Sequence, residues 1–257
     1  MCLILVAWRA HADYPLLLAA NRDEFHARAA APAAWWQDPQ ILAGRDLSAG
    51  GTWLGVARDG RFAALTNYRD PAILQRDAPS RGELVPATLA VMLPVEQRLQ
   101  QLRRTAGNYN GFNLIFSDGQ RLAVFESVPG DGRVLEPGVY GLSNHLLDTP
   151  WPKLRHAKSA LSAAMARLPD ERPLLELLRD ERRADDAQLP RTGVSLEWER
   201  LLSSAFIRAP GYGTRCSSIL LMDRHGGVRF SEWNWDESGA LSGQVEHRFE
   251  IAAAIGA

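Results

Sequence analysis

Cysteine is scarce in this chain of 257 residues, which contains two, Cys2 and Cys216. A single possible pair is no disulfide framework for a chain of this length, and it favours a reducing compartment. Charge of one sign is lacking as well, because 29 Lys and Arg face 30 Asp and Glu at a formal net charge of −1. Nucleic acids and anionic membrane surfaces select basic patches, so this balance argues against both as partners.

Long apolar runs are also missing. No stretch approaches the ~18 apolar residues that a bilayer span requires, and residues 3–8 have neither the basic n-region nor the A-x-A site of a signal peptide. The six histidines show no metal-ligand spacing with cysteine, which argues against a metal site. We therefore expect a cytoplasmic protein with no membrane span, and its ordinary globular composition suits a single domain over residues 1–257.

Strand-like segments come in hairpins and helical segments in blocks. The apolar or alternating runs typical of strands occupy residues 2–8, 15–25, 41–46, 51–57, 61–68, 110–127, 138–145, 214–236 and 245–251. Helical patterns occupy residues 82–104, which Pro94 is expected to split, and 151–168, and the charged residues 170–200 are expected to form short surface helices with a loop. This order predicts an α+β fold in which helices cover antiparallel sheets.

Cys2 stands directly behind the initiator methionine, in the kind of start from which Met1 is commonly removed. Removal leaves Cys2 with a free α-amine, whose ordinary pKa of about 7.7–8.0 is close to the thiol's value of about 8.5. Nucleophile and general base then share one residue, as in N-terminal threonine catalysis. The alternative is that Cys2 is a small buried hydrophobe.

A polar cluster, Arg22, Asp23 and Glu24, ends the second predicted strand. In a hairpin that starts at Cys2, the second strand returns toward Cys2 and brings this cluster within reach of the thiol. A cation there lowers the pKa of the thiol, and a carboxylate orients the α-ammonium. The alternative is a charged strand end that faces water.

Further motifs follow Cys2 in order along the chain. They are NRDEF (residues 21–25), GGTWLGV (50–56), ALTNYRDP (64–71), SRGELV (80–85), NGFNL (110–114), GLSNHLLDTPWPK (141–153) and TRCSSILL (214–221). Together they resemble the NRDE family, which includes the transport and Golgi organisation 2 proteins, over most of the chain. The resemblance implies an N-terminal-nucleophile hydrolase-like fold: a four-layer αββα sandwich of two antiparallel sheets with helices on both outer faces.

The choloylglycine hydrolase and penicillin V acylase group resembles this chain more distantly. Its members cleave linear amides with an N-terminal cysteine, supported by two asparagines and a late arginine. The resemblance implies Asn67 as donor to the oxyanion, and Asn144 as holder of the α-amine or the substrate carbonyl. It implies that Arg215 stabilises the thiolate and binds an acyl or carboxylate group.

That group also has an Arg-x-x-Asp pair at the end of the second strand, and here the present sequence departs from the pattern. Without a gap the pair falls on Asn21 and Glu24. With a one-residue shift, Arg22 aligns and Asp23 is the nearest carboxylate. Both placements remain open at the level of the sequence.

Trp53 and His145 are further candidates for the pocket. The glycines before Trp53 are expected to form a bulge or a tight turn that places its ring over the pocket, with a core tryptophan as the alternative. His145, beside Asn144 in a polar loop, is the histidine expected to contact a ligand. Trp35 and Trp36 precede a loop with proline and are expected to form an exposed lip.

These observations lead to three candidate functions of different classes. One is a cysteine amidohydrolase that acts, without a cofactor, on a small molecule with a non-peptide amide or other acyl bond. Another, suggested by the family resemblance, is a non-catalytic trafficking protein for haem or acyl-CoA-type lipids in the same pocket. Haem needs an axial ligand, for which Cys2 and His145 are the candidates. A purely structural or interaction protein is the third alternative.

Overall fold

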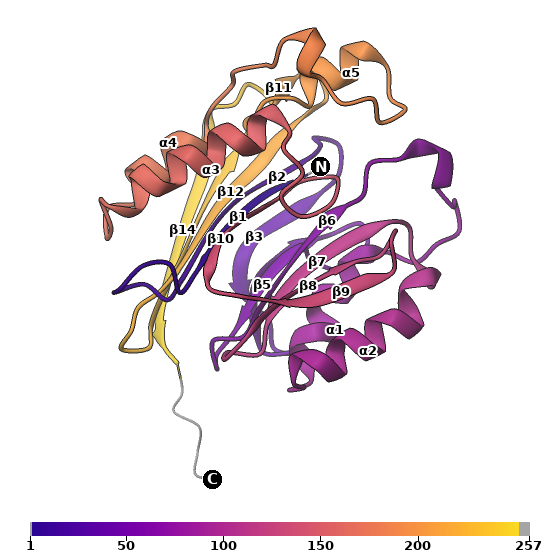
Figure 1. The fold of residues 1–257 in the computed structure, drawn as a ribbon. Helices are drawn as coiled ribbons and strands as arrows, with labels where there is room; N and C mark the ends of the chain where they lie inside the picture. The colour runs from indigo at the N-terminus through magenta and orange to yellow at the C-terminus, as the bar shows by residue number, and fades with distance from the viewer. Residues whose placement is uncertain (1, 252–257) are drawn as a thin grey trace.

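The computed structural model describes residues 2–251, which form two stacked antiparallel sheets (Figure 1). The first sheet contains β10 (Gly138–Leu142), β1 (Cys2–Trp8), β2 (Leu16–Phe25), β12 (Tyr212–Met222), β13 (Gly227–Trp235) and β14 (Leu241–Glu250), in this spatial order, with β11 (Arg208–Ala209) beside β12. The second contains β3 (Ala30–Trp35), β4 (Ile41–Asp46), β5 (Leu54–Ala57), β6 (Phe62–Asn67), β7 (Phe112–Ser117), β8 (Leu122–Glu126) and β9 (Asp131–Leu135), in chain order.

Helices cover both outer faces. The α-helices are α1 (Leu84–Ala90), α2 (Val95–Thr105), α3 (Pro152–Met165), α4 (Arg172–Leu178) and α5 (Leu196–Leu201). The 3₁₀ turns are η1 (Pro71–Ile73), η2 (Arg81–Glu83), η3 (Ala106–Asn108) and η4 (Asp186–Gln188). Figure 1 shows α3 and α4 outside the first sheet and α1 and α2 outside the second. None of the helices within residues 2–251 has the length and apolar character needed to cross a membrane.

Three apolar clusters confirm the predicted αββα layers. One fills the space between the sheets, and the other two lie between each sheet and its helices. Strand β1 contributes to two of them, because Ile4 and Val6 face the second sheet while Leu3 and Leu5 face the layer of α3 and α4. Burial on both faces is the reason why this strand is apolar throughout.

Strand register places the first residue of β1 in a row across three strands. Cys2 pairs with Arg22 on β2, and Arg22 also pairs with Cys216 on β12, just past a bulge in that strand. Paired residues on neighbouring strands project to the same face of a sheet. Both cysteines belong to the cluster between the sheets, so this row faces the second sheet.

The expected tryptophan lip is wrong. Residues 30–35 form strand β3, which the sequence did not indicate because its alanines and proline are poor strand formers. An edge position accommodates Pro32, since that side needs no ladder hydrogen bond. Trp36 is buried and donates its indole N–H to the carbonyl of Ala43 at 3.1 Å, and Trp35 packs edge-on against Phe249.

Candidate functional site

A cavity of about 630 Å³ lies between the sheets, at the end where β1 begins and β2 finishes. Its volume is in the range of small-molecule sites. Seven of the side chains singled out in the sequence line it: Cys2, Arg22, Asp23, Glu24, Trp53, Asn67 and Arg215. Asn144 and His145 are not part of the described lining.

The Cys2 side chain is buried at the cavity wall, directly across from Arg22. Burial raises the pKa of the Cys2 thiol, and the neighbouring Arg22 cation opposes this shift without cancelling it. The thiol is therefore neutral at pH 7, and it needs a base that removes its proton before it can attack a substrate.

A raised thiol pKa makes a testable prediction about Cys2 alkylation. Because only the thiolate reacts, the rate with iodoacetamide should rise with pH to a midpoint above the ordinary value of about 8.5. Arg22→Gln removes the opposing cation and should move the midpoint higher still. The rates can be followed by peptide mass spectrometry in a Cys216→Ala background, and a midpoint at or below that of free glutathione would contradict the prediction.

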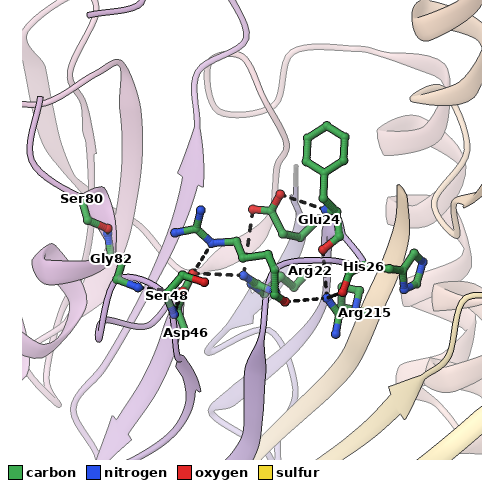
Figure 2. A network of polar contacts seen from close by, with 11 residues as sticks. Arg22, Glu24, His26, Asp46, Ser48, Ser80, Gly82 and Arg215 are labelled. Atoms are coloured by element: carbon green, nitrogen blue, oxygen red, sulfur yellow. Dashed lines mark hydrogen bonds and ion pairs between the residues drawn. The ribbon is translucent and has the colours of Figure 1, made fainter. Parts of the chain in front are cut away.

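Arg22 belongs to a charged network that closes one side of the cavity (Figure 2). Its Nη2 atom lies 3.4 Å from Asp46 Oδ2 and 4.0 Å from Glu24 Oε2. Arg28 donates from Nε to the same Asp46 oxygen at 2.6 Å. Although burial acts in the opposite direction, this hydrogen bond holds the pKa of Asp46 below its ordinary value. Neither Arg28 nor Asp46 was singled out in the sequence.

Asp23 follows the position of β2 that pairs with Cys2, lies on the amino side of Cys2, and itself pairs with Thr214 on β12. Its buried carboxylate accepts a hydrogen bond from Thr214 Oγ1 at 2.7 Å. Burial raises the pKa of Asp23, and the Lys153 cation acts against this shift. The position suits a carboxylate that holds a cationic group beside Cys2.

Asn21 projects to the opposite face of the sheet. Its Nδ2 donates to the carbonyls of Leu178 and Ala205 at 2.7 and 2.8 Å, beneath α4. Of the two placements that the sequence left open, the structure therefore brings Arg22 and Asp23 to Cys2, and it uses Asn21 to anchor a helix. Glu24 lines the cavity in either case.

The two candidate asparagines contact each other next to Cys2. Asn144 Nδ2 donates to Asn67 Oδ1 at 2.9 Å, and Ser143 Oγ donates to the Cys2 carbonyl at 3.2 Å. The contact with Asn144 engages the side-chain oxygen of Asn67 and thereby orients its NH₂ group. Asn67 is part of the cavity wall, whereas Asn144 is fully buried behind it.

Arg215 holds the turn between β2 and β3. Its Nη1 donates to the carbonyls of Phe25, His26 and Arg28 at 3.0, 3.3 and 2.9 Å (Figure 2). This nitrogen is committed to the backbone, so Arg215 shapes the wall on which the Arg22 network rests.

His145 lies outside the cavity lining. Its Nδ1 is 2.9 Å from Thr149 Oγ1, and its ring lies near those of Tyr68 and Trp151, at centroid distances of 5.1 and 5.9 Å. Burial lowers the pKa of His145. Trp53, by contrast, contributes both to the cavity wall and to the core between the sheets.

A buried ionic cluster near Asp23 was not anticipated. Arg69 Nη1 pairs with Glu199 Oε2 at 2.9 Å, with both side chains almost inaccessible to solvent. Burial, together with Arg69, lowers the pKa of Lys153 to about 8. The sequence assigned the segment around Glu199 to the surface, because its many charges are typical of solvated helices. Arg69 and Lys153 fall within the motifs ALTNYRDP and GLSNHLLDTPWPK, and these motifs were the signal from which the two residues could have been found.

Three of the quoted motifs meet around Arg81, which also lines the cavity. Ser80 caps the 3₁₀ turn through a hydrogen bond from Gly82 N, and Gly82 O accepts from Thr52 N at 3.0 Å. Arg81 Nη1 donates to the carbonyl of Gly111 at 2.9 Å. The glycine-rich motifs therefore position the turn that carries Arg81.

Gly51→Ala is expected to destabilise the protein by about 1–3 kcal/mol, the usual range for overpacking. An added Cβ at position 51 would overlap the carbonyl group of Gly82, which is backbone and cannot rotate away. Thermal unfolding measures the effect. Gly107→Ala is the matched control, because nothing lies within 4 Å of its added Cβ, and equal melting temperatures for the two variants would refute the prediction.

Comparisons with known proteins agree with the motif pattern. A family model described as Transport and Golgi organisation 2 matches residues 1–237. The Transport and Golgi organization protein 2 homologs of Bos taurus and Homo sapiens are 40% and 39% identical over 240 and 239 residues, covering 85% of this chain and 86% of each relative. The Drosophila melanogaster protein is 30% identical over 248 residues, with the same coverage.

The solved structures that match this chain are more distant in sequence. A mutant conjugated bile acid hydrolase from Clostridium perfringens has a TM-score of 0.45 at 11% identity, covering 98% of this chain and 92% of that one. The Caenorhabditis elegans N-acylethanolamine-hydrolyzing acid amidase ortholog has a TM-score of 0.42 at 10% identity, with 86% and 92% covered. The family match and the identity to the curated relatives show that this chain belongs to the Transport and Golgi organisation 2 family.

Proposed function

We propose that this protein is an N-terminal cysteine hydrolase that cleaves a non-peptide amide or related acyl bond in a small molecule. The observation that carries the proposal is the placement of Cys2 at the cavity wall, with Arg22 opposite and Asp23 on its amino side. The proposal requires removal of Met1, a position outside the described residues.

In the proposed reaction the α-amine of Cys2 accepts the thiol proton, and the sulfur attacks the substrate carbonyl carbon. The NH₂ group of Asn67 donates to the oxyanion that forms, while Asp23 holds the α-ammonium. Cleavage of the C–N bond transfers the proton to the departing amine and leaves an acyl group on sulfur. Water then attacks this thioester, the acid departs, and the thiol is restored.

An active ester tests the acylation step. Incubation with p-nitrophenyl butyrate should add one butyryl group to Cys2 in protein that lacks Met1, seen by intact mass and peptide mapping. Cys2→Ala should remove the adduct, and Cys216→Ala, which changes the second thiol of the same cavity, should keep it. Retention of Met1, or a Cys2 that stays unmodified while a known cysteine amidase is acylated, would defeat the proposal.

Haem fits this cavity less well than an acyl substrate. The described lining holds no histidine, methionine or tyrosine, so Cys2 and Cys216 are its two candidate axial ligands. Burial raises the pKa of both thiols, whereas a metal binds the thiolate. We therefore favour hydrolysis over haem trafficking. A carrier of acyl-CoA-type lipids would give saturable binding without an adduct on Cys2.

A further inference from the structure

The described lining of the cavity contains five arginines and four carboxylates, so cationic groups are in excess. Arg22 and Arg28 both pair with Asp46, and Arg22 also lies 4.0 Å from Glu24 Oε2. Arg81 and Arg215 form no ion pair within 4.0 Å among the described residues. Glu232, also in the lining, has a pKa raised by burial, which makes its negative charge less stable. An anionic ligand would restore the balance of charge.

Arg81 is the cation best placed to receive that ligand. It belongs to the half of the molecule that carries the second sheet, while Cys2 begins β1 in the first, and both line the same cavity. Its hydrogen bond to Gly111 uses one Nη1 donor of a guanidinium that has five. Arg215, to which the sequence assigned the role of binding a carboxylate, has its Nη1 bound to three backbone carbonyls.

Arg22 provides a second observation that points to an anion. Its Nη1 is buried and has no hydrogen-bond partner among the described residues, although its Nη2 lies near Asp46. An unsatisfied donor on a buried cation is costly, and an oxyanion beside Cys2 would satisfy it after a small rotation of the side chain.

We propose that the ligand of this cavity carries a carboxylate, and that Arg81, with Arg22 beside the thiol, binds this group and sets the specificity. The planar guanidinium fork matches a carboxylate and keeps its charge at any physiological pH. The apolar remainder of the ligand would pack against the wall formed by Trp53, Leu65 and Pro79. This proposal names the substrate class of the hydrolase proposed above. Its meaning for catalysis therefore rests on that proposed function.

A pair of alkylating reagents tests the charge preference without any turnover. Iodoacetate is anionic and iodoacetamide is neutral, and both react with Cys2 by the same displacement. A bond forms between sulfur and the reagent carbon, the C–I bond breaks to release iodide, and the thiol proton goes to solvent base. The ratio of the two rates at Cys2, measured by peptide mapping in a Cys216→Ala background, reports the preference for an anion next to the thiol.

Relative to free glutathione, we expect the iodoacetate to iodoacetamide ratio at Cys2 to be about tenfold higher, as an ion pair worth about 1.4 kcal/mol would produce. Arg81→Met should remove most of this preference, and Arg81→Lys should keep part of it. Arg58→Met is the matched control, because Arg58 stacks on Trp35 outside the cavity lining. A variant that loses stability changes both rates, whereas the loss of a charge contact changes their ratio.

Equal ratios for Cys2 and glutathione, or an Arg81→Met variant that keeps the preference, would overturn the proposal. If neither reagent alkylates Cys2, the melting temperatures of the protein with octanoate and with octanamide test the proposal instead. Octanoate should stabilise the wild type more than octanamide does, and Arg81→Met should remove the difference. If Cys2 is butyrylated but shows no preference for anions, this inference is wrong while the proposed hydrolysis stands. If Cys2 prefers anions but is not butyrylated, the proposed hydrolysis is wrong while this inference stands.

Discussion

Replacing Arg69 by methionine is expected to lower the free energy of unfolding by about 3–5 kcal/mol, the usual cost of breaking a buried ion pair. The carboxylate of Glu199 would then stay buried without the Arg69 cation. Its other hydrogen bonds come from the N–H and hydroxyl groups of Thr192. Urea denaturation measures the loss. The Arg69→Met/Glu199→Leu double variant should recover part of the stability, because no charge is then left buried alone.

A solvent-exposed pair is the matched control for this experiment. Arg200 and Asp186 form a bidentate pair with both side chains about half exposed, and they belong to the same region of the chain. Because water solvates whichever partner remains, Arg200→Met should lower the free energy of unfolding far less than Arg69→Met does. Similar losses for Arg69→Met and Arg200→Met would contradict the role assigned to the buried pair.

Replacing Asn67 by alanine is expected to slow butyrylation of Cys2 about 10²–10³-fold, as the loss of one oxyanion donor does elsewhere. The side-chain oxygen of Asn67 is held by Asn144, so its NH₂ group is preset for the oxyanion before the substrate arrives. Pre-steady-state release of p-nitrophenol gives the acylation rate. Asn144→Ala should cause a smaller loss, since it frees Asn67 to rotate without removing the donor.

Asn110 supplies the control, as a second asparagine of the same cavity lining. Its side chain is already engaged with the backbone of Gln75, through a donated and an accepted hydrogen bond. Asn110→Ala should therefore leave the acylation rate of Cys2 near the wild-type value. If Asn67→Ala behaved like Asn110→Ala, Asn67 would not be the oxyanion donor.

The first hairpin was open to prediction because its signals are local. The apolar run of β1 and the return of β2 set two antiparallel strands, and antiparallel pairing brings the end of the second strand to the start of the first. That placed Arg22 and Asp23 beside Cys2, as the register shows. The four layers followed from the family resemblance together with hairpins and helix blocks.

Side-chain faces and distant partners required the tertiary structure. A change of one residue in register exchanges the two faces of a strand, so the sequence left Asn21 and Arg22 as alternatives until the pairing with Cys2 was known. The β3 strand carries weak local signals and is stabilised by its contacts with β4.

By itself, the sequence determined the β1–β2 hairpin and the family, and with them the proximity of Cys2 to the NRDE cluster. The tertiary structure alone decided that Arg81 joins the cavity of Cys2, that His145 stays out of it, and that Arg69 meets Glu199, 130 positions further along the chain. The physical reason is that periodicity and turn chemistry act over a few residues, whereas charge balance in a cavity is set by segments that meet only when the two sheets stack.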